Sequence, residues 1–204
     1  MRGKIIELTQ EQIVQRALAQ RGRPVLYRLK YPNGGEDPEA AGPEAMYEGQ
    51  RVADCMAVAA HSAGFDRAQH GKFPPTPSVS SGSINTDSMI DEAKLHGKWF
   101  TIKKEPELGD FLVTHTFWKK LPIPRRVIGH IGVITGYGYK LSPQEAYVAR
   151  GLAGLQVTHC SPYNYQFTGK KSAIWTTSGS LWGGYPQHYF IRFNRDYARS
   201  LSNG

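Results

Sequence analysis

Two residue types in this chain can carry out nucleophilic chemistry together. Cys55 directly follows an aspartate, and His130 and His159 come later, each beside an apolar, β-branched run. A thiolate attacks carbonyl carbons, and an imidazole can take up and return the proton that the thiol loses. The sequence therefore offers Cys55 as a nucleophile, His130 as its base and His159 as the polar group that fixes the tautomer of His130.

The residues around Cys55 predict a helix with the cysteine in its first turn. In residues 53–64 (ADCMAVAAHSAG), Asp54 suits the N-cap and Gly64 suits the C-terminal stop. The unpaired amides at a helix N-terminus stabilise a thiolate, so we expect a lowered pKa for the Cys55 thiol. The same amides can bind the oxyanion that forms during attack on a carbonyl. The competing interpretation is a cysteine buried as a small apolar side chain.

The two histidines accompany strand patterns. Four runs are rich in β-branched and aromatic residues and predict strands: 109–113, 130–135, 155–159 and 189–193. His130 begins its run, so its side chain can face the end of the helix that carries Cys55. An ordinary strand-end histidine is the competing interpretation. The other histidines are interpreted as structural or surface residues: His61, His70, His96, His115 and His188.

Helical patterns precede most of the strands. Thr9 with Gln12 forms a capping-box signature for a helix that Gly22 and Pro24 would end, and residues 85–95 predict another helix. Helices first and an antiparallel sheet second is the α+β order. The 204 residues suit a single domain, 1–204, interrupted by turn-rich segments at 31–50 and 71–83.

The cysteine count and the charge limit the function classes. Cys55 and Cys160 are the only cysteines, which excludes a disulfide framework and a cysteine-rich zinc site, although one disulfide between them stays open. His159 and Cys160 lack further ligands at metal-binding spacing, so we expect no metal. The net charge of +8 favours an anionic partner: nucleic acid, acidic lipid or the bacterial envelope. The basic residues are scattered, so a nucleic-acid partner is not expected.

Three motifs in order resemble the NlpC-type papain-like peptidases and their CHAP amidase relatives. These are Asp54-Cys55 at the head of a helix, the Gly-Asp-Phe-Leu-Val run at 109–113 and the His-Ile-Gly-Val-Ile run at 130–134, followed by His159. The resemblance spans residues 27 to about 160. It implies a papain-like fold, a Cys-His-His mechanism without a cofactor, and peptidoglycan as the substrate.

The resemblance also suggests residues that support the site. Tyr27 corresponds to a tyrosine segment that lines the substrate groove, and a buried strand aromatic is its competing interpretation. Asp54 and Asn164 are further candidates for substrate binding or oxyanion support, and Asn164 is a weaker candidate than His159 for orienting the base. Cys160 should point to the strand face opposite His159.

The chain departs from the family pattern in two ways. Members commonly continue Asp-Cys-Ser-Gly-Phe, whereas this chain has Met56-Ala57-Val58 after the cysteine. Insertions are expected near 66–84, 136–154 and 165–188. We expect the last segment to form a loop beside the groove, where Trp175 and Trp182 could contact sugars or peptide stems, but core packing is the favoured interpretation for each tryptophan.

The expected function is cleavage of an amide bond in peptidoglycan, either within the stem peptide or between sugar and peptide. No signal peptide or membrane span is apparent at the N-terminus, so we expect delivery by a phage particle, a lysis system or a secretion system. Phage structural proteins are expected partners. The alternatives are an inactive structural or adaptor protein of a phage particle on the same fold, and a thiol acyltransferase or deamidase.

Overall fold

The computed structural model describes residues 5–29, 37–67, 73–74, 76–77, 84–119, 125–138, 141 and 143–202. His70 and most of the predicted irregular segment at 71–83 lie outside the described residues, as do Gly34 and Gly35 of the turn-rich segment.

A six-stranded antiparallel sheet, with strand order β10-β9-β8-β5-β11-β4, forms the frame of the molecule. Its strands are β4 (Phe100–Lys103), β5 (Phe111–Thr114), β8 (Ile131–Tyr137), β9 (Leu155–Cys160), β10 (Ile174–Ser178) and β11 (His188–Phe193). The four strands predicted from the sequence are therefore confirmed. Strand β10 lies inside the segment predicted to be a loop, so that prediction is wrong for residues 174–178.

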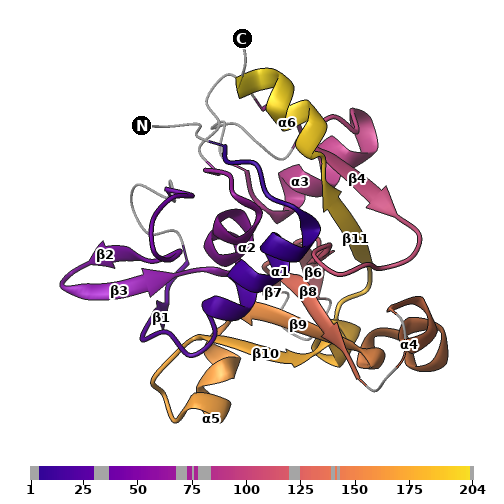
Figure 1. Ribbon diagram of the computed structural model, residues 1–204. Helices are drawn as coiled ribbons and strands as arrows, with labels where there is room; N and C mark the ends of the chain where they lie inside the picture. The colour runs from indigo at the N-terminus through magenta and orange to yellow at the C-terminus, as the bar shows by residue number, and fades with distance from the viewer. Residues whose placement is uncertain are drawn as a thin grey trace.

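Helices α1 (Gln10–Ala19), α2 (Cys55–Ala63) and α3 (Thr86–Leu95) pack on one face of this sheet. Alternation along β5 separates the faces, because Phe111 and Val113 join the cluster under the helices whereas Leu112 joins the cluster on the other face. Figure 1 shows α2 near the centre of the molecule. The α+β fold class predicted from the sequence is confirmed at this level.

Local signals fix the helix ends. The predicted capping box of α1 is present, with the Thr9 side chain accepting from Gln12 N–H and the Gln12 side chain accepting from Thr9 N–H. The helix ends at Ala19, a turn earlier than Gly22, which takes the left-handed conformation with φ of 79°. The predicted helix at 85–95 is α3, which Asn85 caps.

The remaining elements surround the sheet. A small sheet contains β1 (Leu26–Tyr27), β2 (Ala45–Tyr47) and β3 (Gln50–Ala53), and a hairpin contains β6 (Phe117–Lys119) and β7 (Arg125–Val127). The other helices are α4 (Pro143–Arg150), α5 (Tyr165–Thr168) and α6 (Arg195–Ser202). Within the described residues there are also the 3-10 helices η1 (Gly151–Gly154), η2 (Pro162–Asn164) and η3 (Gly179–Gly184).

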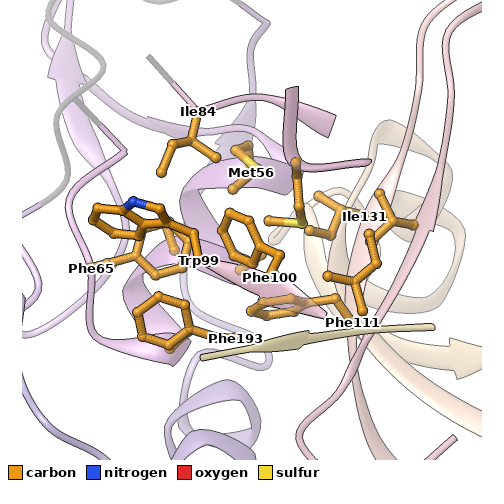
Figure 2. Close-up of a cluster of buried hydrophobic side chains, with 14 of the residues drawn as sticks. Met56, Phe65, Ile84, Trp99, Phe100, Phe111, Ile131 and Phe193 are labelled. Carbon is orange, nitrogen blue, oxygen red and sulfur yellow. The ribbon is translucent and has the colours of Figure 1, made fainter. Parts of the chain in front are cut away.

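The main core lies between α2, α3 and the sheet and is rich in aromatic rings (Figure 2). Phe65, Trp99, Phe100 and Phe193 contact one another with ring centroids 5.0 to 6.3 Å apart. Met56 belongs to this cluster and is buried. An apolar residue after Cys55 is therefore explained by core packing, where a serine hydroxyl would have to find a hydrogen-bond partner.

Candidate active site

Cys55 is the first residue of α2, as the sequence predicts. Strand β3 ends at Ala53, and Asp54 has extended backbone geometry and accepts a hydrogen bond from Ala57 N–H at 2.8 Å. Gly64 ends the helix with φ of 81°, a conformation that glycine adopts without strain. Every residue of α2 is buried, so the short side chains allow the helix to lie close to β8 and β9.

The Asp54 carboxylate is occupied by structural contacts. Besides capping α2, it forms a buried ion pair with Arg67, with Oδ2 2.8 Å from Nη1. A carboxylate that accepts from both a helix amide and a guanidinium holds the start of α2 in place. The structure therefore gives Asp54 a positioning role at the start of α2.

Burial decides the protonation state of Cys55. The thiol is almost inaccessible, and burial, reinforced by the neighbouring Asp54 charge, raises its pKa to about 12. The Ile131 and Met56 amides and the Arg67 charge act in the opposite direction, but they are weaker. The expected lowering of the pKa is wrong. The free-energy cost of moving a thiolate out of water exceeds the stabilisation of the thiolate by the helix N-terminus.

His130 and His159 lie together and continue into a chain of hydrogen bonds. His130 Nε2 is 2.8 Å from His159 Nδ1, and His159 Nε2 is 2.9 Å from the hydroxyl of Thr177 on β10. A threonine hydroxyl can accept or donate, so two proton arrangements satisfy the chain. When His130 Nε2–H donates to His159, the His159 Nε2–H donates to Thr177, and His130 Nδ1 is left with a free lone pair.

The close approach of the two histidines requires a glycine in β8. A Cβ atom on Gly132 would lie 2.9 Å from the His159 Cβ and 2.5 Å from a Val157 methyl. Side-chain atoms at such distances would push β9 away. The His-Ile-Gly-Val motif therefore needs a glycine at position 132, because a larger residue would collide with β9.

Trp182 covers the two imidazoles. Its ring stacks on His130 with centroids 5.1 Å apart and contacts His159 edge-on at 4.9 Å. Burial lowers the pKa of His130 to about 4, and burial together with His130 lowers the pKa of His159. Both imidazoles and the Cys55 thiol are thus neutral at neutral pH, so the resting pair is thiol and imidazole.

The backbone that follows His130 lies close to Cys55, whereas the His130 ring stacks on Trp182. The Ile131 amide, which directly follows His130, is within hydrogen-bonding reach of the Cys55 sulfur. Thr114 on β5 fixes His130 from the other side, because Thr114 N–H donates to His130 O and His130 N–H donates to Thr114 Oγ1, both at 2.9 Å.

Two tyrosines lie near the thiol. Tyr27 is opposite Ala53 in the parallel β1–β3 pair, and burial together with Cys55 and Asp54 raises its pKa. Tyr185 was not identified from the sequence. Burial and Cys55 raise the pKa of its phenol, which is hydrogen-bonded to Thr114. A neutral phenol near the sulfur can donate a hydrogen bond to a developing oxyanion.

Asn164 and Cys160 are buried and contact other parts of the fold. Asn164 is buried, and its amide donates to His159 O at 2.9 Å and to Ala173 O at 2.8 Å, so it holds the end of β9 and does not contact His130 through these bonds. Cys160 points into a different cluster from His159, as predicted, and its sulfur lies 3.5 Å from Ala53 O. Both cysteines are free, so Cys55 and Cys160 do not form the disulfide that the sequence left open.

Sequence analysis did not identify Thr177 and Tyr185, and it placed Trp182 only in a loop beside the groove or in the core. All three come from residues 165–188, which were expected to be a loop. The aromatic content of this segment was the only available signal. A pocket of about 260 Å³ that is lined by Thr177, Arg21 and Gln156 was not predicted either.

No group of three or more potential metal ligands occurs among the described residues. Within the same part of the chain, no helix is long and apolar enough to cross a membrane. No protein-family model, curated protein or solved structure matches this chain. The resemblance to papain-like peptidases therefore rests on the sequence motifs.

Proposed function

We propose that this protein is a papain-like cysteine hydrolase of the NlpC/CHAP type that cleaves an amide bond of bacterial peptidoglycan. The observation that carries the proposal is the chain from His130 through His159 to Thr177, together with a cysteine at the head of a buried helix whose sulfur lies near the Ile131 amide. The net charge of +8 supports an anionic envelope as the target.

In this mechanism the His130 Nδ1 lone pair takes the Cys55 proton as the sulfur attacks the amide carbonyl. The carbon–sulfur bond forms, the amide carbonyl becomes an oxyanion, and the helix amides with Tyr185 stabilise it. The imidazolium then protonates the leaving amine, and water releases the acyl group from Cys55. His159 and Thr177 hold the His130 ring throughout.

A neutral resting pair has a consequence for this mechanism. Since the pKa of Cys55 lies near 12 and that of His130 near 4, the thiolate does not accumulate before substrate binds. Proton transfer to His130 therefore accompanies attack on the carbonyl, as in serine hydrolases.

The test is digestion of purified peptidoglycan, with the released fragments identified by mass spectrometry. The wild type should release new amines, and Cys55→Ala should release none, whereas Cys160→Ala serves as the matched cysteine control. The position of the new amine distinguishes a stem-peptide endopeptidase from an amidase acting between sugar and peptide. Equal release by wild type and Cys55→Ala would exclude the cysteine mechanism.

The same deep burial of Cys55 favours a second candidate, an inactive structural or adaptor protein of a phage particle. That candidate predicts no product from any substrate and no reaction of Cys55 with an acyl-type inhibitor. A thiol acyltransferase or deamidase would instead react with the inhibitor but release nothing from peptidoglycan. Delivery by a phage particle or a lysis system fits each of these candidates.

A further inference from the structure

The hairpin of β6 and β7 begins and ends at the candidate active site. It is inserted between Thr114 and His130, which are joined by hydrogen bonds from Thr114 N–H to His130 O and from His130 N–H to Thr114 Oγ1. A further hydrogen bond from Gly129 N–H to Thr116 Oγ1, at 3.1 Å, closes the base of the hairpin. Asp87 of α3 holds the same base by accepting from Thr116 N–H at 2.8 Å. The hairpin is therefore anchored to the segment that carries the base.

The two faces of the hairpin differ. Phe117 lies opposite Val127, and its ring contacts Tyr185 with centroids 5.8 Å apart, so this face points to the site. Trp118 lies opposite Arg126 on the other face, because directly paired residues share a face. The Trp118 side chain is 67% exposed.

An exposed tryptophan beside a cation offers a ligand both a stacking face and a positive charge. Trp118 and Arg126 are both exposed, as is Lys119, and neither basic residue forms an ion pair with another described residue. Tryptophan and arginine are the residues that most often dominate binding energy. An indole face stacks on the C–H face of a sugar ring, while a guanidinium pairs with carboxylates.

We infer that the outer face of the hairpin, formed by Trp118 and Arg126, binds the glycan strand of peptidoglycan. This inference rests on the proposed function and names the part of the substrate that lies outside the bond-cleaving site. A sugar ring stacks on Trp118, and Arg126 pairs with a carboxylate of a stem peptide attached to the strand. Since the hairpin base includes His130's neighbours, a bound strand presents its stem peptide to Cys55.

The experiment measures binding of the full chain to insoluble peptidoglycan by sedimentation. All proteins carry Cys55→Ala, so the polymer stays intact and the result does not depend on hydrolysis. Adding Trp118→Ala should weaken binding by roughly tenfold or more, whereas Trp118→Phe should retain most of it. Arg126→Ala should weaken binding and reduce its sensitivity to salt.

Val148→Ala is the matched control, because Val148 is 81% exposed on α4 and lies outside the hairpin. Thermal unfolding of each variant checks that the fold is intact. Peptidoglycan stripped of phosphate-bearing polymers should bind the parent equally well. Unchanged binding by Trp118→Ala, failure of the parent to bind, or loss of binding after stripping would each overturn the inference. Product release by wild type tests the proposed function separately.

Discussion

The Cys55 thiol begins a helix, yet it is harder to ionise than a free cysteine. Dipole stabilisation at a helix N-terminus amounts to about 1 kcal/mol, and desolvation of a fully buried charge exceeds that several-fold. The Asp54 carboxylate adds repulsion at the same point. At the scale of single residues, the proposed nucleophile is therefore a thiol that loses its proton to a base during attack, and not a preformed thiolate.

Alkylation of Cys55 tests this state. In a Cys160→Ala background, the rate with iodoacetamide should rise about tenfold per pH unit from neutral pH upward, because the thiolate fraction grows this way well below a pKa of about 12. A mass-spectrometric time course at several pH values measures it. A rate that stays flat across neutral pH would indicate a thiolate–imidazolium pair.

Thr177 should act as a positioning residue. Thr177→Val removes the hydroxyl bonded to His159 Nε2, so the His159 and His130 rings lose their fixed tautomers. We expect kcat on a soluble stem peptide to fall by roughly tenfold to a hundredfold with KM little changed. Thr177→Ser keeps the hydroxyl and should restore activity and the pH profile. Equal losses in the valine and serine variants would point to packing alone.

At the scale of elements, buried carboxylates hold the helices to the sheet. Glu92 of α3 is fully buried, and its carboxylate accepts from the Lys98, Trp99 and Phe100 amides, each at 2.9 Å. Three backbone donors at the start of β4 thus depend on one side chain. Asp54 has the corresponding function at the start of α2, where it binds Ala57 N–H and Arg67.

Glu92→Ala should destabilise the fold strongly. The variant leaves three amide donors without their partner, which should lower the free energy of unfolding by about 3 kcal/mol or more. Urea unfolding monitored by tryptophan fluorescence measures the change. Glu11→Ala, at an exposed position in the first turn of α1, should change the free energy by only about 0.5 kcal/mol. Similar effects in the two variants would contradict this account of Glu92.

At the scale of the whole molecule, neutral histidines that are buried or partly buried make the fold sensitive to acid. Burial lowers the pKa of His61, His130, His159 and His188. The unfolded chain, in which histidines have a pKa near 6.5, then binds more protons than the native state between about pH 6.5 and pH 4. Stability contributed by these groups is present at neutral pH and is lost as the pH falls through this window.

The free energy of unfolding should therefore fall between pH 7 and pH 4.5. For His130 alone, with a native pKa of about 4, the loss should be about 2 kcal/mol. Urea midpoints at the two pH values measure it, and His130→Gln should reduce the slope by that amount. Identical slopes for wild type and His130→Gln would show that His130 is not held neutral.

The sequence by itself determined the local features of this protein. The caps of α1 and α2, the position of Cys55 and four strands of the sheet follow from neighbouring residues, because hydrogen bonds within one turn and alternation along one strand create those signals. The pairing of His130 with His159 was also expected from adjacent strands, and it is present.

Only the tertiary structure decided the features that depend on distant segments. Thr177, Trp182 and Tyr185 reach the site because β10 and η3 fold back beside β9, and nothing in residues 165–188 alone indicates that path. The direction of the Cys55 pKa likewise depends on how completely other elements exclude water from the head of α2. A motif can name the nucleophile, but its ionisation is set by burial, which belongs to the whole fold.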